Sequence, residues 1–186
     1  MIWWPTEVPI LRHGPITLRP AQEKDILSIY EACQDPIIPR FTTVPSPYKM
    51  EHAISFIREQ APTHFAGKSE LLFVITEENP EEEKFCGVIS FHTINLPNHT
   101  AELGYWIGLS SRGKGIGSRA AATISDYGIL TMGFRRIEAL VDVDNVPSRA
   151  LLITAGYELE GLMRRKVTRD DGSQIDMALF SRVAPL

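Results

Sequence analysis

Hydrophobic and polar positions in the first third of the chain predict one short strand followed by two helices. After an early Gly-Pro break, residues 16–21 (ITLRPA) alternate apolar and polar side chains as a strand does. Apolar residues then recur at helical spacing over residues 23–33 and again over residues 49–60. The intervening stretch DPIIPRFTTVPSP contains four prolines, which exclude a helix interior and a central strand and so predict a long loop. Such a loop is either a wall of a substrate pocket or a surface excursion.

From Leu71 onward the pattern becomes that of β-strands. The segments LLFVIT, CGVISFHTI and AELGYWIGL are rich in β-branched and aromatic residues, and the third alternates apolar with polar or small positions. The acidic stretch EENPEEEK (residues 77–84) separates the first two and predicts a solvated turn, and PNH predicts the next turn. Three consecutive strands joined by turns predict an antiparallel meander.

A long amphipathic helix is predicted after the meander. Apolar residues recur at steps of three and four over residues 116–130, which predicts a helix of about 17 residues ending at Gly133. The sequence that follows predicts a strand over residues 136–142 and then a short helix. That helix has Pro147 in its first turn and Gly156 at its C-terminal cap.

Composition and charge narrow the class of protein. The 186 residues, of which 44% are hydrophobic, predict a single domain over residues 1–186 with residues 1–14 as an N-terminal extension. The net charge of -4 and the pI near 5.7 argue against nucleic-acid and anionic-membrane partners, because both require a basic surface. Cys33 and Cys86 lie far apart, so neither a disulfide framework nor a metal site is indicated. With no signal-peptide pattern and no apolar run near about 18 residues, a cytoplasmic location is expected.

The junction between the meander and the long helix carries the stretch SSRGKGIGSRAA, which begins at Ser110. A helix N-terminus offers free N–H groups and the positive end of the helix dipole to an anion. Glycine at Gly113, Gly115 and Gly117 lets the backbone approach a ligand that any Cβ would hold away. The junction is therefore a candidate phosphate-binding loop.

Two phosphate-binding patterns fail at this loop and a third fits. Counted from Gly108, the P-loop pattern G-x-x-x-x-G-K-[ST] ends on Gly115, where Mg²⁺ binding requires a hydroxyl. The dinucleotide pattern G-x-G-x-x-G requires a third glycine where Ser118 stands. The pattern that fits is Arg-x-x-Gly-x-Gly over residues 112–117, although a glycine-rich hexapeptide by itself is also consistent with a simple turn.

Two longer segments decide between these interpretations. Together they resemble the GNAT N-acetyltransferases, in the branch of the ribosomal-protein-alanine (RimJ/RimL-like) acetyltransferases. The two segments are AELGYWIGLSSRGKGIGSRAAATISDYG and FRRIEALVDVDNVPSRALLITAGYELEG. The resemblance is strongest over residues 101–180 and collinear from Ile16 onward. It implies the α/β GNAT fold, a mixed and mostly antiparallel central sheet of about seven strands with helices on both faces.

The resemblance also implies acetyl-CoA as cosubstrate, without a metal. Backbone N–H groups from Gly113 to Ser118 would bind the pyrophosphate, and Arg112 and Lys114 would supply positive charge. The backbone of the preceding strand would pair with the pantetheine arm. Asn145 would bond a pantetheine amide or cap the next helix, or do both. The implied cosubstrate-binding residues are Trp106, Ile107, Gly108, Arg112, Gly113, Lys114, Gly115, Ile116, Gly117, Ser118 and Asn145.

Acetyl transfer to an amine requires a neutral nucleophile and a protonated leaving thiol. Glu102, on the strand beside the pantetheine arm, is the candidate proton acceptor through a water; otherwise it is a solvated strand carboxylate. Ser148, three residues after Asn145, matches the serine of the ribosomal branch and is the candidate proton donor to the sulfur; otherwise it is a capping serine. Many relatives carry a tyrosine seven residues after the asparagine, and this chain has Leu152 there.

The acceptor favoured by the resemblance is the α-amine of a protein N-terminus. A small amine, such as a polyamine, an amino acid or an aminoglycoside, is the close rival, and a non-catalytic acyl-CoA-binding module is the third hypothesis. Val167 stands where some ribosomal relatives carry a glutamate, so no proton-accepting role transfers to the last hairpin and the ribosomal substrate is itself in question. The sequence does not indicate an oligomeric state, although dimers are common in such folds and a homodimer is one assembly to test.

Overall fold

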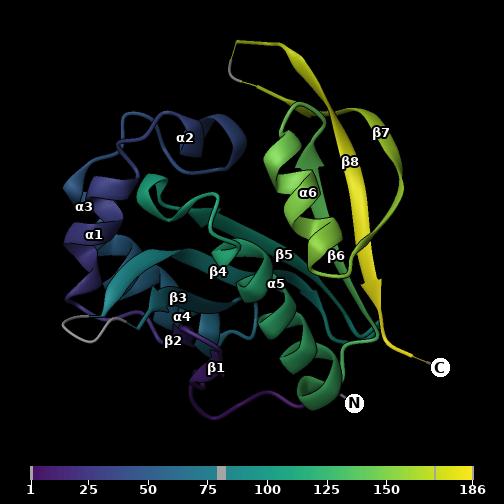
Figure 1. Cartoon of the computed structure of the whole chain (residues 1–186), viewed down its shortest axis with the longest axis horizontal. Helices are drawn as coiled ribbons and strands as arrows, with labels where there is room; N and C mark the ends of the chain where they lie inside the picture. The colour runs from purple at the N-terminus through teal and green to yellow at the C-terminus, as the bar shows by residue number, and fades with distance from the viewer. Residues whose placement is uncertain (1, 79–82, 170, 186) are drawn as a thin grey trace.

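The computed structural model describes residues 2–78, 83–169 and 171–185, and in this part of the chain the strands form one eight-stranded sheet (Figure 1). The strand order is β1-β2-β3-β4-β5-β6-β8-β7, with β5 and β6 parallel and the other neighbouring pairs antiparallel. The strands are β1 (Leu11–His13), β2 (Ile16–Arg19), β3 (Leu71–Glu77), β4 (Lys84–Asn95), β5 (Thr100–Ile107), β6 (Arg136–Asp142), β7 (Glu158–Thr168) and β8 (Gln174–Val183).

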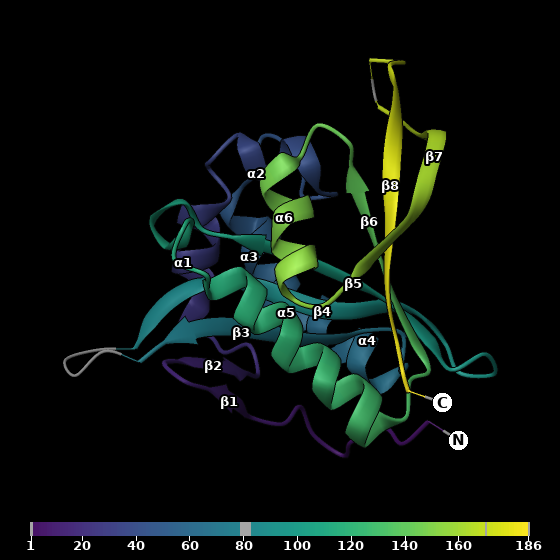
Figure 2. The same cartoon turned by 45° about the vertical axis from the view of Figure 1, so that its right-hand side comes forward.

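Helices cover the two faces of this sheet, as Figure 1 and Figure 2 show. The α-helices are α1 (Asp25–Ala32), α2 (Ile37–Phe41), α3 (Met50–Ser55), α4 (Ala61–Ala66), α5 (Ile116–Tyr127) and α6 (Val146–Thr154). The larger hydrophobic core lies between the sheet and α5, and it includes Phe73, Phe91 and Ile124. The smaller core lies beneath α1 and α3 on the other face and includes Ile29 and Ala53. The predicted mixed, mostly antiparallel sheet with helices on both faces is confirmed.

The strand count is eight rather than about seven, because β1 joins the sheet from within the segment expected to be an N-terminal extension. β1 pairs with β2 in the register Leu11↔Leu18. With three residues and mostly exposed side chains, this edge strand carries too little alternation for its pattern to show in the sequence. The meander, the strand at Arg136–Asp142 and the long helix ending at Gly133 are confirmed. Residues 79–82 of the acidic turn lie outside the described residues.

The prediction that the proline-rich stretch is all loop is wrong, because it contains α2. Pro36 is the N-cap of α2 and Pro39 is its third helical residue. The first N–H groups of a helix have no partner within the helix, so proline at these positions costs no hydrogen bond. The predicted helix over residues 49–60 was also too short. A π-helical turn (Phe56–Gln60) joins α3 directly to α4, and the chain stays helical through Pro62, which has no N–H to donate.

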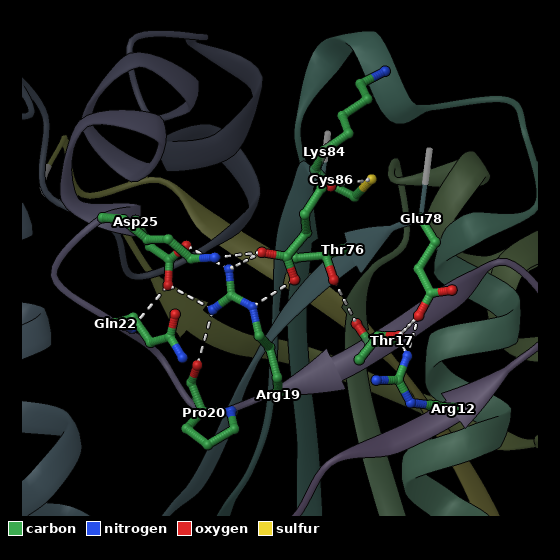
Figure 3. Close-up of polar contacts among 12 residues, drawn as sticks. Arg12, Thr17, Arg19, Pro20, Gln22, Asp25, Thr76, Glu78, Lys84 and Cys86 are labelled. Atoms are coloured by element: carbon green, nitrogen blue, oxygen red, sulfur yellow. Dashed lines mark hydrogen bonds and ion pairs between the residues drawn. The ribbon is translucent and has the colours of Figure 1, made fainter. Parts of the chain in front are cut away.

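A buried ion-pair cluster fastens the first strands to the helical face (Figure 3). Arg19 ends β2 and is 6% exposed, and its guanidinium donates to both carboxylate oxygens of Asp25 at 2.8 Å. It also donates to Glu83, just before β4, at 2.8 and 3.0 Å. The cluster therefore links β2, the start of α1 and the approach to β4.

Within the described residues, no helix is long and apolar enough to cross a membrane. The same part of the chain contains no cluster of histidine, cysteine, aspartate and glutamate suited to a metal ion. Cys33 and Cys86 are both free and buried.

Candidate functional site

The parallel strands β5 and β6 separate after only three paired positions. The last pair is Glu102↔Glu138, beyond which β6 pairs with β8 alone. β5 continues to Ile107 but pairs there only with β4. Figure 2 shows β6 turning away from β5, with α6 beside the opening. Among the residues that the structure describes, the edge of β5 that faces β6 over residues 103–107 therefore has no strand partner, and an extended chain of amides could hydrogen-bond to it.

The glycine loop reaches α5 through two residues in the left-handed region. Gly113 and Gly115 each have φ of +72°, which costs a residue with a Cβ about 1–2 kcal/mol. Gly115 is the N-cap of α5 and makes no side-chain capping bond to the helix. The first N–H groups of α5 thus keep their hydrogen-bonding capacity for an anion, which the positive end of the helix dipole also attracts.

Gly117 is required by packing within the fold, and its part in ligand binding stays a prediction. A Cβ at this position would lie 2.4 Å from Cδ1 of Leu151 on α6 and 3.2 Å from Cγ1 of Ile107 on β5. The absence of a side chain brings the first turn of α5 against both neighbours. The third glycine of the loop therefore sets the position of the helix whose N-terminus faces the opening.

The two cations of the loop are held differently. The Arg112 Nε donates to the carbonyl oxygen of Ile107 at 2.8 Å, and its guanidinium forms an ion pair of 2.7 Å with Asp35. Lys114 is exposed, and its Nζ donates to the carbonyl oxygen of Ser110 at 2.8 Å. The Asp35 carboxylate neutralises the charge of Arg112, and the sequence pattern gave no sign of this partner. Arg112 also occupies a strand carbonyl that was expected to face the pantetheine arm, so its phosphate-binding role stays a prediction.

Asn145 and Ser148 lie together at the start of α6, and Tyr105 of β5 joins them. The Asn145 Oδ1 accepts a hydrogen bond of 3.2 Å from the Ser148 N–H, so the capping interpretation of Asn145 is confirmed. The Ser148 hydroxyl lies 2.6 Å from the Tyr105 hydroxyl. Burial raises the pKa of Tyr105 to about 12. Leu152 is fully buried in the core, so the tyrosine position of many relatives serves packing here.

Glu102 lies on the opposite face of β5 from Tyr105, because the two positions are an odd number of residues apart in a strand. The Glu102 side chain is half-buried, and its cross-strand neighbour on β4 is His92. The His92 ring covers Gly104, where a Cβ would lie 2.7 Å from Nε2. The two predicted catalytic residues therefore approach the opening between β5 and β6 from opposite faces of the sheet.

Tyr105 and His92 are the residues that the sequence interpretation missed at this site. From the sequence, Tyr105 is one of the alternating positions of its strand, and His92 was given no catalytic or binding role. Both are polar aromatic residues on β4 and β5, the two strands that precede the glycine loop, and this feature of the sequence could have identified them.

Comparisons with known proteins agree with this geometry. The model of the acetyltransferase (GNAT) domain matches residues 16–158. An uncharacterized N-acetyltransferase p20 of Bacillus licheniformis is 30% identical over 89% of this chain and 91% of its own. A ribosomal-protein-serine acetyltransferase of Escherichia coli is 33% identical over 55% of this chain and 57% of its own.

One solved structure that is similar to this chain contains the cosubstrate. The microcin C7 self-immunity acetyltransferase MccE, in complex with acetyl-CoA and AMP, is 28% identical with a TM-score of 0.79, covering 92% of this chain and 93% of its own. The expected resemblance to the ribosomal-protein branch is confirmed by the Escherichia coli relative. The separated strands, the glycine loop and the family match lead to one conclusion: this chain belongs to the GNAT family and is an acetyl-CoA-dependent N-acetyltransferase.

Proposed function

We propose that this N-acetyltransferase acetylates the α-amine of a protein or peptide N-terminus. The observation that carries the proposal is the opening between β5 and β6, with Glu102 on one face of the sheet and Ser148 on the other. An acceptor amine and a leaving thiol need opposite proton transfers, and this arrangement offers a separate group for each. The similarity to a ribosomal-protein-serine acetyltransferase supports a protein N-terminus as acceptor.

The basicity of the amine also favours this acceptor. At pH 7 about 10% of an N-terminal amine is neutral, against about 0.04% of a lysine side chain. Glu102 is half-buried, and its register partner Glu138 on β6 is held in an ion pair of 2.7 Å with Arg136, so Glu102 is the carboxylate of this pair proposed to accept the proton. An α-amine therefore needs less help from a carboxylate to become a nucleophile than a lysine or a polyamine does.

The reaction proposed for this chain is a direct transfer. Glu102 accepts the proton of the amine through a water, and the neutral nitrogen attacks the thioester carbonyl carbon. The C–S bond then breaks with its electron pair on sulfur, Ser148 gives the thiolate a proton, and the nitrogen loses its second proton to water as the amide forms. The N–H groups at the start of α5 would hold the pyrophosphate, and the unpaired edge of β5 would hold the pantetheine amides.

A screen of acceptors tests the proposal. Release of free thiol from acetyl-CoA is measured with peptides that have a free N-terminus, with the same peptides blocked at Nα but carrying a lysine, and with polyamines, amino acids and aminoglycosides. We expect a free N-terminus to give the highest kcat/KM, at least about tenfold above the blocked peptide. A small amine that exceeds every free N-terminus by the same factor would establish the rival acceptor. If coenzyme A binds but no amine stimulates release, the chain is an acyl-CoA-binding module after all.

Two variants test the residues. We expect Glu102→Gln and Ser148→Ala each to lower kcat about 100-fold, as the loss of a general base or acid does, while coenzyme A still binds in calorimetry. Glu78→Gln, on the exposed end of the sheet remote from the opening, is the control for removal of a carboxylate. Unchanged turnover in both Glu102→Gln and Ser148→Ala would show that the proton transfers are assigned to the wrong groups.

The remaining expectations concern the setting of the reaction. The two free, buried cysteines are compatible with the reducing cytoplasm, where we place the protein. We also propose a homodimer, which sedimentation velocity would detect as a species of twice the mass.

A further inference from the structure

A partly buried tyrosine of β5 contacts α6 at the opening between β5 and β6. Tyr105 lies beyond the last β5–β6 pair, and its side chain packs against the main core on the α5 face. Its hydroxyl lies 2.6 Å from the Ser148 hydroxyl, 43 residues further along the chain, and 3.4 Å from the Ser148 carbonyl oxygen. The phenol therefore contacts the side chain to which the proposed function assigns proton donation.

The number of hydrogen bonds in each arrangement indicates whether Tyr105 or Ser148 is the donor when Ser148 must release its proton. A separation of 2.6 Å is ordinary for O–H···O, whereas 3.4 Å is at the weak limit. If Ser148 donates to Tyr105, the seryl proton points away from the opening and the phenol retains only the weak contact with the carbonyl. If Tyr105 donates to Ser148, the phenol makes its short bond and the seryl proton is free for another acceptor.

The surroundings keep the phenol in its donor form. Burial raises the pKa of Tyr105 to about 12, which is higher than the pKa of a free phenol, so the hydroxyl stays protonated throughout the neutral range.

We propose that Tyr105 is a positioning residue for acetyl transfer: it donates a hydrogen bond to the Ser148 hydroxyl and directs the seryl proton to the departing sulfur. This inference rests on the proposed function, in which Ser148 is the proton donor. As the C–S bond breaks, the sulfur takes the Ser148 proton and the Tyr105 hydrogen bond stabilises the resulting alkoxide. The nitrogen loses its second proton to water as the amide forms, and that water returns a proton to the Ser148 alkoxide; the first amine proton leaves Glu102 for the solvent.

A double-mutant cycle on the whole chain tests the inference. Kinetic constants for acetyl-CoA are measured for the wild type, Tyr105→Phe, Ser148→Ala and the double variant, with the best acceptor of the screen. We expect Tyr105→Phe to lower kcat about 10-fold with KM changed less than about threefold. In the Ser148→Ala background the same substitution should have no further effect, because the proton that it directs is absent.

Tyr157→Phe is the matched control. The Tyr157 hydroxyl also bonds a serine, Ser125, at 2.7 Å, and the tyrosine is 2% exposed in the same core. Its removal costs a tyrosine–serine hydrogen bond that is more deeply buried, so it should lower the melting temperature at least as much as Tyr105→Phe does while kcat stays at the wild-type value. Tyr105→Met, which also lacks a donor, serves as a second variant if Tyr105→Phe does not fold, and it should show the same loss of kcat.

The outcomes separate the inference from the function on which it rests. If Ser148→Ala turns over normally, the donor role of Ser148 fails and the role of Tyr105 fails with it. If Ser148→Ala is impaired but Tyr105→Phe is not, only the inference is overturned. Equal losses from Tyr105→Phe in both backgrounds, or a kcat loss in Tyr157→Phe of the same size, would also overturn it by showing a purely structural tether.

Discussion

Replacing Gly113 by alanine is expected to weaken coenzyme A binding about 5- to 30-fold. Gly113 has φ of +72°, and a Cβ there would have no atom within 4 Å. The cost is therefore purely that of the backbone conformation, about 1–2 kcal/mol for a residue with a Cβ. Because a Cβ at residue 113 gains no contact that would hold the strained conformation, the loop of the free variant relaxes out of the left-handed region and coenzyme A must restore it. That free energy, converted at 1.4 kcal/mol per tenfold, gives the expected loss of affinity.

Gly14→Ala is the matched control for this experiment. Gly14 lies in the turn between β1 and β2, has φ of +56°, and also leaves a new Cβ without an atom within 4 Å. The pairing of β1 with β2 holds this turn, so the strain should appear as lost stability rather than lost affinity. Coenzyme A should bind Gly14→Ala as it binds the wild type.

Isothermal titration of coenzyme A into the wild type and both variants measures the effect, and thermal unfolding without ligand locates the strain. If Gly113→Ala binds coenzyme A with wild-type affinity, the reasoning is refuted, whether or not thermal unfolding shows a loss of stability. In that case the left-handed loop is not part of the binding surface, and no ligand approaches its backbone closely.

Two further predictions concern stability and the position of α5. Hydrogen bonds from Arg19 lower the pKa of Glu83 to about 2, so its contribution is present above the unfolded pKa of about 4.5 and is lost as pH falls from about 5 to 2. With Glu83 a third exposed, solvent screening reduces this contribution to about 1 kcal/mol; urea unfolding at a series of pH values should show it, and Glu83→Gln should remove it. Gly117→Ala should destabilise the fold by about 1–3 kcal/mol, since its Cβ would lie 2.4 Å from a leucine of α6. An unchanged urea midpoint for Gly117→Ala would contradict the packing reason for this glycine.

Local sequence patterns predicted the parts of the site that are continuous along the chain. The glycine loop, the helix after it and the cap at Asn145 each depend on residues within a few positions of one another. The residue type directly indicates backbone requirements of this kind, because glycine and asparagine have distinct conformational preferences. The helix α2 was not predicted from the proline-rich stretch. The cost of a proline depends on its position within a helix, and the pattern did not show where this helix begins.

Contacts between distant segments could not be predicted in this way. The Tyr105–Ser148 bond joins residues from different elements, and so does the Arg112–Asp35 ion pair. Alternation in β5 indicates only that a side chain at position 105 points inward, and the same pattern holds whether its hydroxyl finds a serine or none. Which polar group it finds depends on where α6 packs, a tertiary property that no single segment encodes.

The register of β5 links these observations to the chemistry. Glu102 and Tyr105 lie three residues apart, and the strand period of two places them on opposite faces of the sheet. A slip of one residue would turn Glu102 into the core beneath α5, where an unpaired carboxylate costs several kcal/mol, and would turn Tyr105 away from Ser148. The pairing of β5 with β4 along most of its length excludes this slip, although β6 leaves after Glu102. Pairing with β4 therefore fixes the position of β5, while β6 separates from it. The fold can thus expose the edge of β5 to a ligand and still keep the side chains of β5 on their correct faces.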